Sequence, residues 1–440
     1  LLRVFDADLR GDVLEIGAGC GAITRYLGEQ GGNVLALEGS TRRAGIARAR
    51  TRDLPNVSVL AENFERFQVD KRFDVITLIG VFEYANLFVS GANPGAKMLE
   101  KVRSLLKPDG LLIIAIENQL GLKYFAGAPE DHVVTPMLGV EGRYNSATPQ
   151  TYGKQALTSL LSGAGFSSNE FFAPFPDYKL PVSIVTEQGF DDPGFDAAAF
   201  AWQSAQRDPQ LPELCTFSLE LAWPQICKNG LGMDMSNSFL IGASPVARKT
   251  LGDGTLAVHF SSDRRAEYCK SSSFRKGPDN TIRVHYEKLA EARAASAADS
   301  IVEFKLSASE PYIKGHVLST KLIDVINVDG WTYGQVGEFL KGYLCILKDV
   351  PNGQLNADGL LPGQLFDAVP QNILIDCQGK PHLIDKEWSL TVGLRIEFLL
   401  FRALRQLLGS VTRFSPSAEF STATYKEFVF AACAAAGYPI

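Results

Sequence analysis

The chain has 440 residues, of which 46% are hydrophobic and 21% are charged, and its formal net charge at pH 7 is −6. This composition is typical of a globular protein, and the negative charge argues against a general nucleic-acid-binding surface. The length predicts two or three domains, and no apolar run reaches the roughly 18 residues that a membrane-spanning helix needs. The seven cysteines lack zinc-binding spacing, which predicts reduced thiols in the cytoplasm.

The first feature along the chain is an apolar run that contains Glu15, continues into a glycine cluster and then becomes helical, over residues 13–27. This order predicts a strand, a tight turn and a helix. Glycines at 17, 19 and 21 let the backbone turn sharply and approach a ligand, while the helix N-terminus offers free N–H groups. Because the chain begins at Leu1, close to this strand, we expect that an upstream segment has been lost.

A second strand, residues 34–38, ends in an acid about twenty residues further on. Glu38 is therefore placed to accept hydrogen bonds from both ribose hydroxyls of a nucleoside. A dinucleotide and S-adenosylmethionine both fit this signal. A carboxylate at Glu15 would oppose a pyrophosphate but would suit the cationic methionyl ammonium, so the second ligand is favoured.

The glycine pattern after Glu15 resembles motif I of the class I S-adenosylmethionine-dependent methyltransferases. The resemblance continues in residues 60–64, beside the adenine in that family, in residues 73–84 and in residues 107–116. It implies an α/β fold with a doubly wound, mostly parallel, Rossmann-like sheet, and S-adenosylmethionine as cofactor. The implied cofactor-binding residues are Glu15, Gly17, Gly19, Gly21, Glu38, Glu62, Asn63 and Gly80.

The segment after the fifth predicted strand, residues 117–132, has no regular period and is predicted to be a loop at the carboxyl edge of the sheet. Loops at this edge form the substrate side of such sites. The candidates for acceptor recognition are Asn118, Lys123, Tyr124, Glu130, Asp131 and His132. Beside two carboxylates, His132 is a candidate catalytic base for an acceptor hydroxyl. The alternative is a structural histidine that only supports the loop.

Residues 151–166 have helical spacing with a glycine stop, and an aromatic strand follows to residue 172. This resembles the closing helix and hairpin of the methyltransferase fold. Residues 118–124 and 174–181 resemble methyltransferases encoded in bacterial surface-glycan gene clusters. The resemblance implies a glycan or sugar-phosphate acceptor.

Two domains joined by a connector are predicted along the chain. Residues 1–185 form the methyltransferase domain, and residues 186–235 form a helical connector without strands. From residue 236 to 440 a second α+β domain begins with antiparallel strands and becomes helical beyond Trp331. The four stretches with a strand period are residues 237–242, 256–260, 266–270 and 281–288.

A second constellation lies near the end of the chain, where Asp367, Asn372 and Asp385 flank an apolar hairpin. Their spacing resembles the catalytic loop and metal-binding segment of protein-kinase-like phosphotransferases. The resemblance implies that Asp367 is catalytic and orients the attacking hydroxyl, while Asn372 and Asp385 are metal ligands that hold magnesium with ATP. The alternative is a hairpin whose polar residues only cap its turns.

This second domain departs from the kinase pattern. No glycine-rich phosphate loop appears in its first strands, and Leu365 stands where a histidine is expected. Lys288 is the predicted ATP-binding lysine, with Lys270 as the alternative. Because of these departures, we expect the kinase-like fold more firmly than kinase activity.

The combination of domains resembles the bifunctional kinase and methyltransferase enzymes that cap O-antigen polysaccharides. It predicts O-methylation of a surface-glycan precursor or of its terminal phosphate. The alternatives are a methyltransferase with an inactive kinase-like scaffold and a small-molecule methyltransferase outside glycan chemistry. The expected partners are the glycan acceptor and glycan-assembly proteins, and the expected location is the cytoplasm, with peripheral association at the inner membrane as a variant.

Overall fold

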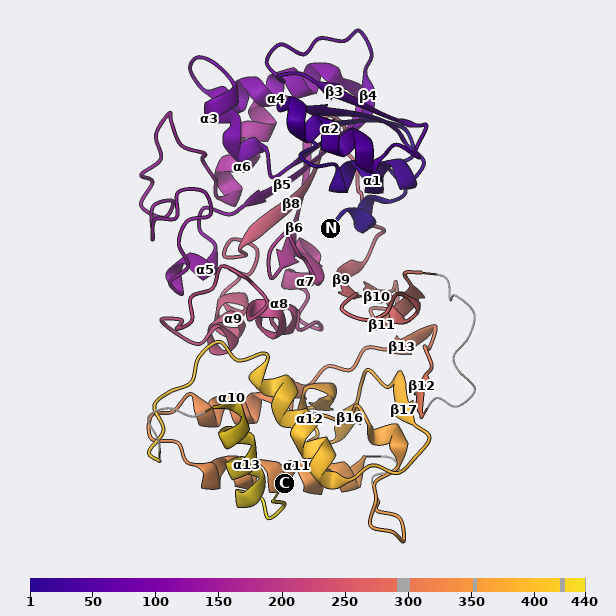
Figure 1. Cartoon of the computed structure of the whole chain (residues 1–440), viewed down its shortest axis with the longest axis vertical. Coiled ribbons are helices and arrows are strands. Elements are labelled where there is room, and N and C mark those ends of the chain that lie inside the picture. Colours follow the sequence, from indigo (N-terminus) through magenta and orange to yellow (C-terminus); the bar gives the residue numbers. More distant parts are fainter. Residues whose placement is uncertain (291–300, 351–353, 420–423, 440) are drawn as a thin grey trace. The chain divides into compact units, whose positions relative to one another are not determined.

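The computed structural model describes residues 1–290, 301–350, 354–419 and 424–439. The chain forms two compact units, which are described separately (Figure 1). Unit 1 consists of Leu1–Asp191, Gln210–Pro212 and Asn229–Val258. Unit 2 consists of Asp192–Pro209, Glu213–Lys228 and His259–Ile440.

Unit 1 is built on a sheet with the strand order β7-β6-β8-β5-β4-β1-β2-β3. The strands are β1 (Asp12–Ile16), β2 (Asn33–Glu38), β3 (Val57–Ala61), β4 (Phe73–Ile79), β5 (Leu106–Glu117), β6 (Ser168–Phe175), β7 (Ser183–Thr186) and β8 (Ser238–Ser244). The pairings among β1 to β5 are parallel, and those of β6, β7 and β8 within unit 1 are antiparallel. The predicted mostly parallel α/β sheet is therefore confirmed.

Helices follow the parallel strands β1, β2, β4 and β5 of unit 1, whereas β3 leads to β4 without one. The helices of unit 1 are η1 (Leu2–Phe5), α1 (Ala22–Glu29), α2 (Thr41–Arg50), η2 (Phe82–Tyr84), α3 (Ala85–Phe88), α4 (Pro94–Leu105), α5 (Leu122–Phe125), α6 (Lys154–Gly163) and α7 (Glu187–Asp191). Strand β5 is buried from Gly110 to Glu117. An uninterrupted apolar run of this kind is typical of a parallel strand covered on both faces.

The sequence placed the stretch 237–242 at the start of the second domain, but strand β8 lies between β5 and β6 of unit 1. All seven residues of β8 are buried, including the consecutive apolar residues Phe239, Leu240 and Ile241. A strand buried on both faces needs apolar side chains at successive positions, whereas an outer strand alternates. The strand was predicted correctly, and its sheet was not.

Unit 2 contains the hairpin of β10 (Lys270–Lys276) and β11 (Ile282–Lys288), with β13 (Ser309–Pro311) beside β11. Strand β9 (Thr255–Ser261) begins in unit 1 and ends in unit 2. The smaller strands are β12 (Val302–Phe304), β14 (His316–Val317), β15 (Ile373–Ile375), β16 (Pro381–Leu383) and β17 (Trp388–Leu390). The stretch 266–270 was predicted as a strand, but η3 (Ala266–Tyr268) is a 3-10 turn and β10 starts only at Lys270.

The helices of unit 2 are α8 (Ala197–Ala205), α9 (Leu219–Lys228), α10 (Thr320–Ile326), α11 (Tyr333–Asp349), η4 (Gly363–Leu365), η5 (Pro370–Asn372), α12 (Ile396–Leu408) and α13 (Tyr425–Ala435). Capping boxes start α11 at Thr332 and α13 at Thr424. The predicted connector 186–235 is helical, and its residues are divided between the two units. In the described part of the chain no helix has both the length and the apolar character of a membrane span.

Candidate functional site

The glycine turn after β1 contains two glycines that packing requires and one that borders open space. Gly17, Gly19 and Gly21 all have positive φ angles, of 80°, 55° and 79°. A Cβ at Gly17 would lie 2.4 Å from Val81 Cγ2, and one at Gly21 would lie 2.7 Å from Ala47 Cα. At Gly19 a Cβ would meet no atom within 4 Å. Packing thus requires two of the glycines, and the third borders open space that a ligand can enter.

Glu15 lies in β1 directly before this turn and is 3% exposed. Its Oε2 atom has no hydrogen-bond partner among the residues that the structure describes. Burial, with a further contribution from the nearby Glu38 charge, raises the pKa of Glu15 to about 7. A buried carboxyl group with an unsatisfied oxygen fits a cationic group such as the methionyl ammonium of S-adenosylmethionine.

Glu38, the last residue of β2, ties the turn to the second strand. Its Oε2 accepts a hydrogen bond from the Gly19 N–H at 2.8 Å. Its Oε1 accepts hydrogen bonds from Ser40 N at 2.9 Å and from Arg43 Nη2 at 2.7 Å. Since Oε2 has a single donor, it retains capacity for a ribose hydroxyl. Sequence reasoning did not single out Arg43, which is one of several arginines on α2.

The other predicted cofactor residues lie at the same edge of the sheet. The Glu62 N–H donates to the Glu38 carbonyl at 3.1 Å, so the end of β3 lies beside β2. Glu62 Oε1 accepts from Asn63 N at 2.8 Å. Gly80, after β4, has φ 65°, and a Cβ there would lie 2.7 Å from Tyr178 Oη and 3.7 Å from Glu83 Oε1. The structure therefore gathers the predicted cofactor residues of unit 1 at the carboxyl ends of β1 to β4.

Next to Gly80 lies a group that we name the acid–histidine cluster, formed by Glu83, Glu117 and His132. One ligand atom from each residue lies within 4.8 Å of the others. Glu83 comes from η2 after β4, Glu117 ends β5, and His132 comes from the predicted acceptor loop. The sequence indicated His132 only. For Glu83 and Glu117, the available sequence signal was an acidic residue at the end of an otherwise apolar segment.

Lysines compensate part of the charge around the acid–histidine cluster. Lys179 Nζ lies 2.5 Å from Glu117 Oε1 and 2.8 Å from Asp131 Oδ1. The fully buried Lys123 Nζ lies 3.2 Å from Asp131 Oδ2 and 3.3 Å from Asp177 Oδ2. Of the predicted acceptor residues, Lys123 and Asp131 thus form a buried ion pair, and Lys179 was missed.

The members of the acid–histidine cluster have perturbed pKa values. Burial and the Glu117 charge raise the pKa of Glu83 to about 8. Burial opposes ionisation of Glu117 too, but the hydrogen bond to His132 and the Lys179 charge outweigh it and lower the Glu117 pKa. Burial acts to lower the His132 pKa, yet Glu117 and Glu83 raise it overall. Carboxyl and imidazole groups perturbed in this way are typical of functional sites.

In unit 2 a second group, which we name the lysine–acid cluster, consists of Lys270, Asp385 and Glu387. Lys270 Nζ lies 2.5 Å from Asp385 Oδ1 and 2.9 Å from Glu387 Oε2. Asp385 has a φ of 54°, a left-handed conformation that a non-glycine residue rarely adopts. Lys288 was the predicted lysine, but it is exposed at the end of β11, opposite Lys270 in the hairpin. The structure thus brings the alternative lysine to Asp385.

The remaining predicted residues of unit 2 lie near this cluster. Asp367 is mostly buried and forms an ion pair with Arg402, whose guanidinium lies 3.7 Å from the Phe366 ring centroid. Asn372 Nδ2 donates to the Asp367 carbonyl at 3.0 Å. Burial, with a contribution from the Asp385 charge, raises the pKa of Asp367. Arg402, on α12, carried no sequence signal because its partner lies 35 residues earlier.

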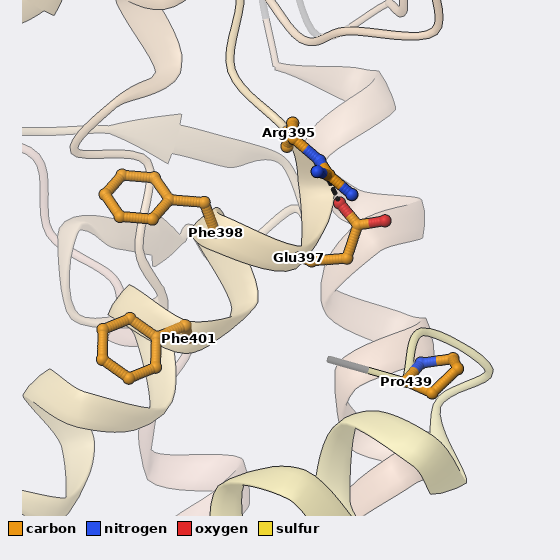
Figure 2. A pocket seen from close by; sticks show the side chains of 5 residues that line it. All are labelled: Arg395, Glu397, Phe398, Phe401 and Pro439. Carbon is orange, nitrogen blue, oxygen red and sulfur yellow. Dashed lines mark hydrogen bonds and ion pairs between the residues drawn. The ribbon is translucent and has the colours of Figure 1, made fainter.

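A hollow elsewhere in unit 2 is separate from these groups. It is lined by Arg395, Glu397, Phe398, Phe401 and Pro439 (Figure 2). Arg395 and Glu397 pair across 3.3 Å, and Figure 2 shows both phenylalanines projecting from α12. None of the residues predicted for either site lines this hollow.

Comparison with known proteins shows that the first part of the chain is similar to methyltransferases. Residues 14–112 match a family described as a methyltransferase domain. An uncharacterized methyltransferase of Alkaliphilus oremlandii is 31% identical over 106 residues, which are 24% of this chain and 45% of the relative. A ubiquinone biosynthesis O-methyltransferase of Rickettsia bellii is 30% identical over 117 residues, which are 26% of this chain and 46% of the relative.

Among solved structures, the N-methyltransferase NodS of Bradyrhizobium japonicum in complex with S-adenosylhomocysteine matches with 21% identity and a TM-score of 0.23. The match covers 26% of this chain and 59% of that one. The chain spans about half the length of the curated relatives it matches, 45% and 46%. The matched residues include residues 14–16 of β1 with the glycine turn, and all of β2, β3 and β4. Residues 14–112 of this chain are accordingly similar to a methyltransferase domain.

Proposed function

We propose that unit 1 binds S-adenosylmethionine and transfers its methyl group to an oxygen nucleophile. One observation carries the proposal: the unsatisfied, buried Glu15 carboxyl lies at a glycine turn that Glu38 holds in place. A cationic methionyl group would satisfy Glu15, and the free capacity of Glu38 Oε2 would accept a ribose hydroxyl. A dinucleotide would instead bring its pyrophosphate against two carboxyl groups.

The remaining donor contacts follow from the turn and the neighbouring strand ends. Gly17, Gly19 and Gly21 allow the donor to approach the backbone, and Gly80 keeps the end of β4 clear of a side chain. Glu62 and Asn63, beyond β3, face the adenine in this proposal. Each of these assignments uses a residue at the carboxyl edge of a parallel strand, where ligands bind in open α/β sheets.

The acceptor lies beside the acid–histidine cluster in this proposal. Its hydroxyl oxygen attacks the methyl carbon, an O–C bond forms, and the C–S bond breaks with its electron pair remaining on sulfur. The hydroxyl must lose its proton, and the neighbouring His132, Glu83 and Glu117 favour this loss. We propose a surface-glycan precursor or its terminal phosphate as acceptor, since the positively charged Lys179, whose side chain is 45% exposed, lies beside the cluster. A small molecule outside glycan chemistry is the alternative.

We also propose that unit 2 binds ATP with magnesium. The observation in favour is the lysine–acid cluster, in which a buried lysine and a left-handed aspartate meet beside Asp367. A strained residue held by an ion pair is a common feature of ligand sites. Lys270 contacts the phosphates in this proposal, Asn372 and Asp385 hold the metal, and Asp367 orients an acceptor hydroxyl. An inactive scaffold for glycan-assembly proteins is the alternative.

Calorimetric titration of the full chain tests the donor, with NAD as comparator. We expect S-adenosylmethionine to bind and NAD to bind far more weakly. Tighter binding of NAD would contradict the proposal. Mass spectrometry then follows methyl acceptance over a panel of sugars, sugar phosphates and small phenolic acceptors. A gain of one methyl group on sugars or sugar phosphates supports glycan chemistry, and acceptance confined to the phenols supports the small-molecule alternative.

A further inference from the structure

Three atoms of the acid–histidine cluster converge without being satisfied. Glu83 Oε2, Glu117 Oε2 and His132 Nε2 are buried. Apart from the long contact between Glu117 Oε2 and His132 Nε2, at 3.5 Å, none of them has a hydrogen-bond partner within the described ranges of the chain. Glu83 is 1% exposed and Glu117 is not exposed at all. An unsatisfied buried oxygen carries a large desolvation penalty, and two such oxygens converge here with an unsatisfied nitrogen.

The geometry of these atoms fits a metal ion. The distance from His132 Nε2 to Glu117 Oε2 is 3.5 Å. Ligand atoms at about 2.0–2.2 Å from a tetrahedral ion lie roughly 3.4 Å from one another. The set that includes Glu83 lies within 4.8 Å. A small side-chain movement of Glu83 would bring the third ligand to the same ion.

The surroundings hold the ligands in position. The other imidazole nitrogen, His132 Nδ1, lies 3.3 Å from Tyr84 Oη, which leaves Nε2 as the nitrogen that faces Glu117. The other oxygen of Glu117, Oε1, contacts Lys179 Nζ at 2.5 Å and Tyr178 Oη at 3.3 Å. The backbone N–H of His132 donates to Glu130 Oε2 at 2.8 Å. Such outer contacts orient the ligands of protein metal sites.

We propose that Glu83, Glu117 and His132 bind a divalent first-row transition-metal ion. One imidazole and two carboxylates suit manganese, iron or zinc, whereas magnesium keeps its water and prefers oxygen ligands alone. Three protein ligands leave further coordination positions open. His132 is then a metal ligand and not the predicted base, and the ion instead activates the acceptor hydroxyl.

The role of the ion rests on the proposed methyl transfer. The acceptor hydroxyl oxygen takes an open position on the ion, which lowers the hydroxyl pKa and releases its proton to water. The resulting oxygen anion attacks the methyl carbon, and the C–S electron pair stays on sulfur. The ion itself undergoes no change of oxidation state in this step.

Manganese titration of the full chain, after removal of metals with a chelator, tests the site without donor or acceptor. Electron paramagnetic resonance measures free manganese, and the Asp385→Asn background removes the rival metal ligand in unit 2. We expect one bound ion per chain. Glu117→Gln in this background should weaken binding by more than about a hundredfold, since loss of an outer contact alone costs about 10–100-fold.

His382→Ala in the same background is the matched control, because His382 forms a similar pair with Asp376, at 2.7 Å, outside the cluster. It should leave manganese affinity unchanged. His132→Asn is a second test variant in case Glu117→Gln does not fold, and the melting temperature of each variant reports folding. Absence of manganese binding, or equal binding by the folded cluster variants and the control, would overturn the proposal and indicate that water satisfies these atoms.

Titration of the same samples with S-adenosylmethionine separates this proposal from the proposed function. Manganese binding without donor binding would contradict methyl transfer and keep the metal site. Donor binding and methyl transfer that survive complete metal removal would contradict the metal site's role and keep the methyltransferase function.

Discussion

The two charged clusters differ in how their atoms are satisfied. The acid–histidine cluster of unit 1 has three buried atoms that, apart from the 3.5 Å contact between Glu117 and His132, have no hydrogen-bond partners in the described residues. The lysine–acid cluster of unit 2, in contrast, is closed by its own ion pairs. A ligand that enters a cluster with unsatisfied atoms stabilises those atoms directly, because no existing contact has to be broken. A cluster with internal pairs must first exchange partners, so part of the binding energy is offset. We therefore expect unit 1 to be the more prepared of the two sites.

The largest expected effect concerns the exchange of partners in unit 2. Magnesium and ATP together should raise the melting temperature of the wild-type chain, because a ligand that binds only the folded state stabilises it. Asp385→Asn should abolish this increase, since it removes the proposed metal ligand. Thermal unfolding with and without metal measures the effect. A wild-type chain without a metal-dependent increase would refute the ATP site and leave the scaffold alternative.

Asp367→Asn separates nucleotide binding from phosphate transfer in the same experiment. Its carboxylate is assigned to the acceptor hydroxyl, so the metal-dependent melting shift should persist while any phosphate transfer to a glycan is lost. Loss of the melting shift in this variant would show that Asp367 supports the nucleotide site, through its Arg402 pair, and does not act on the acceptor.

The next effect tests the acid–histidine cluster. His132→Ala should lower methyl transfer by about a hundredfold or more, the usual cost of losing a proton-transfer group, and a lost metal ligand would act in the same direction. Donor affinity should remain nearly unchanged because the residue lies on the acceptor side. Single-turnover rates and calorimetry measure the two quantities. A parallel fall in both would mean that His132 only supports its loop.

A further prediction concerns the stability cost of the buried Glu15 carboxyl. Its pKa is raised from 4.5 to about 7, so it remains protonated in the folded state where the unfolded chain is already ionised. Folding is therefore penalised progressively as pH rises from 4.5 to 7, by up to about 3 kcal/mol. Glu15→Gln should stabilise the donor-free chain by that amount at pH 8 and by nothing at pH 4. Urea unfolding at both pH values tests this, and a pH-independent gain would contradict it.

Glu38→Ala should weaken S-adenosylmethionine binding ten- to a hundredfold, because a hydrogen bond to a charged group contributes about 1.5–3 kcal/mol. Calorimetry measures the affinity. Glu29→Ala is the matched control, since it removes an exposed acid that pairs with Arg25 on α1. Equal affinities in Glu38→Ala and in the control would end the ribose assignment.

The smallest expected effect is that of Lys288→Ala, which is compared with Lys270→Ala in the same β10–β11 hairpin. Lys270 is buried and paired with Asp385, whereas Lys288 is exposed. Lys288→Ala should change the melting temperature shift with magnesium and ATP very little, and Lys270→Ala should remove most of it. The reverse order would restore Lys288 as the nucleotide lysine.

The sequence alone was sufficient for the local elements of unit 1. Glycines with positive φ, an acid at the end of β2 and strand and helix patterns depend on neighbouring residues. The strand and turn around Glu15, Gly17 and Gly19 and the strand that ends at Glu38 were therefore predicted without coordinates. The order of elements then predicted the parallel sheet, because short connections leave few topologies.

Only the tertiary structure decided which distant residues meet. Strand β8 joins β5 and β6 although more than sixty residues separate it from β6 in the chain, and Glu83 and Glu117 meet His132 from three different segments. The choice between Lys270 and Lys288 depended on the register of one hairpin. A residue pattern records the face that is buried, but the partner is determined by long-range packing and by the charges that have to be satisfied away from water.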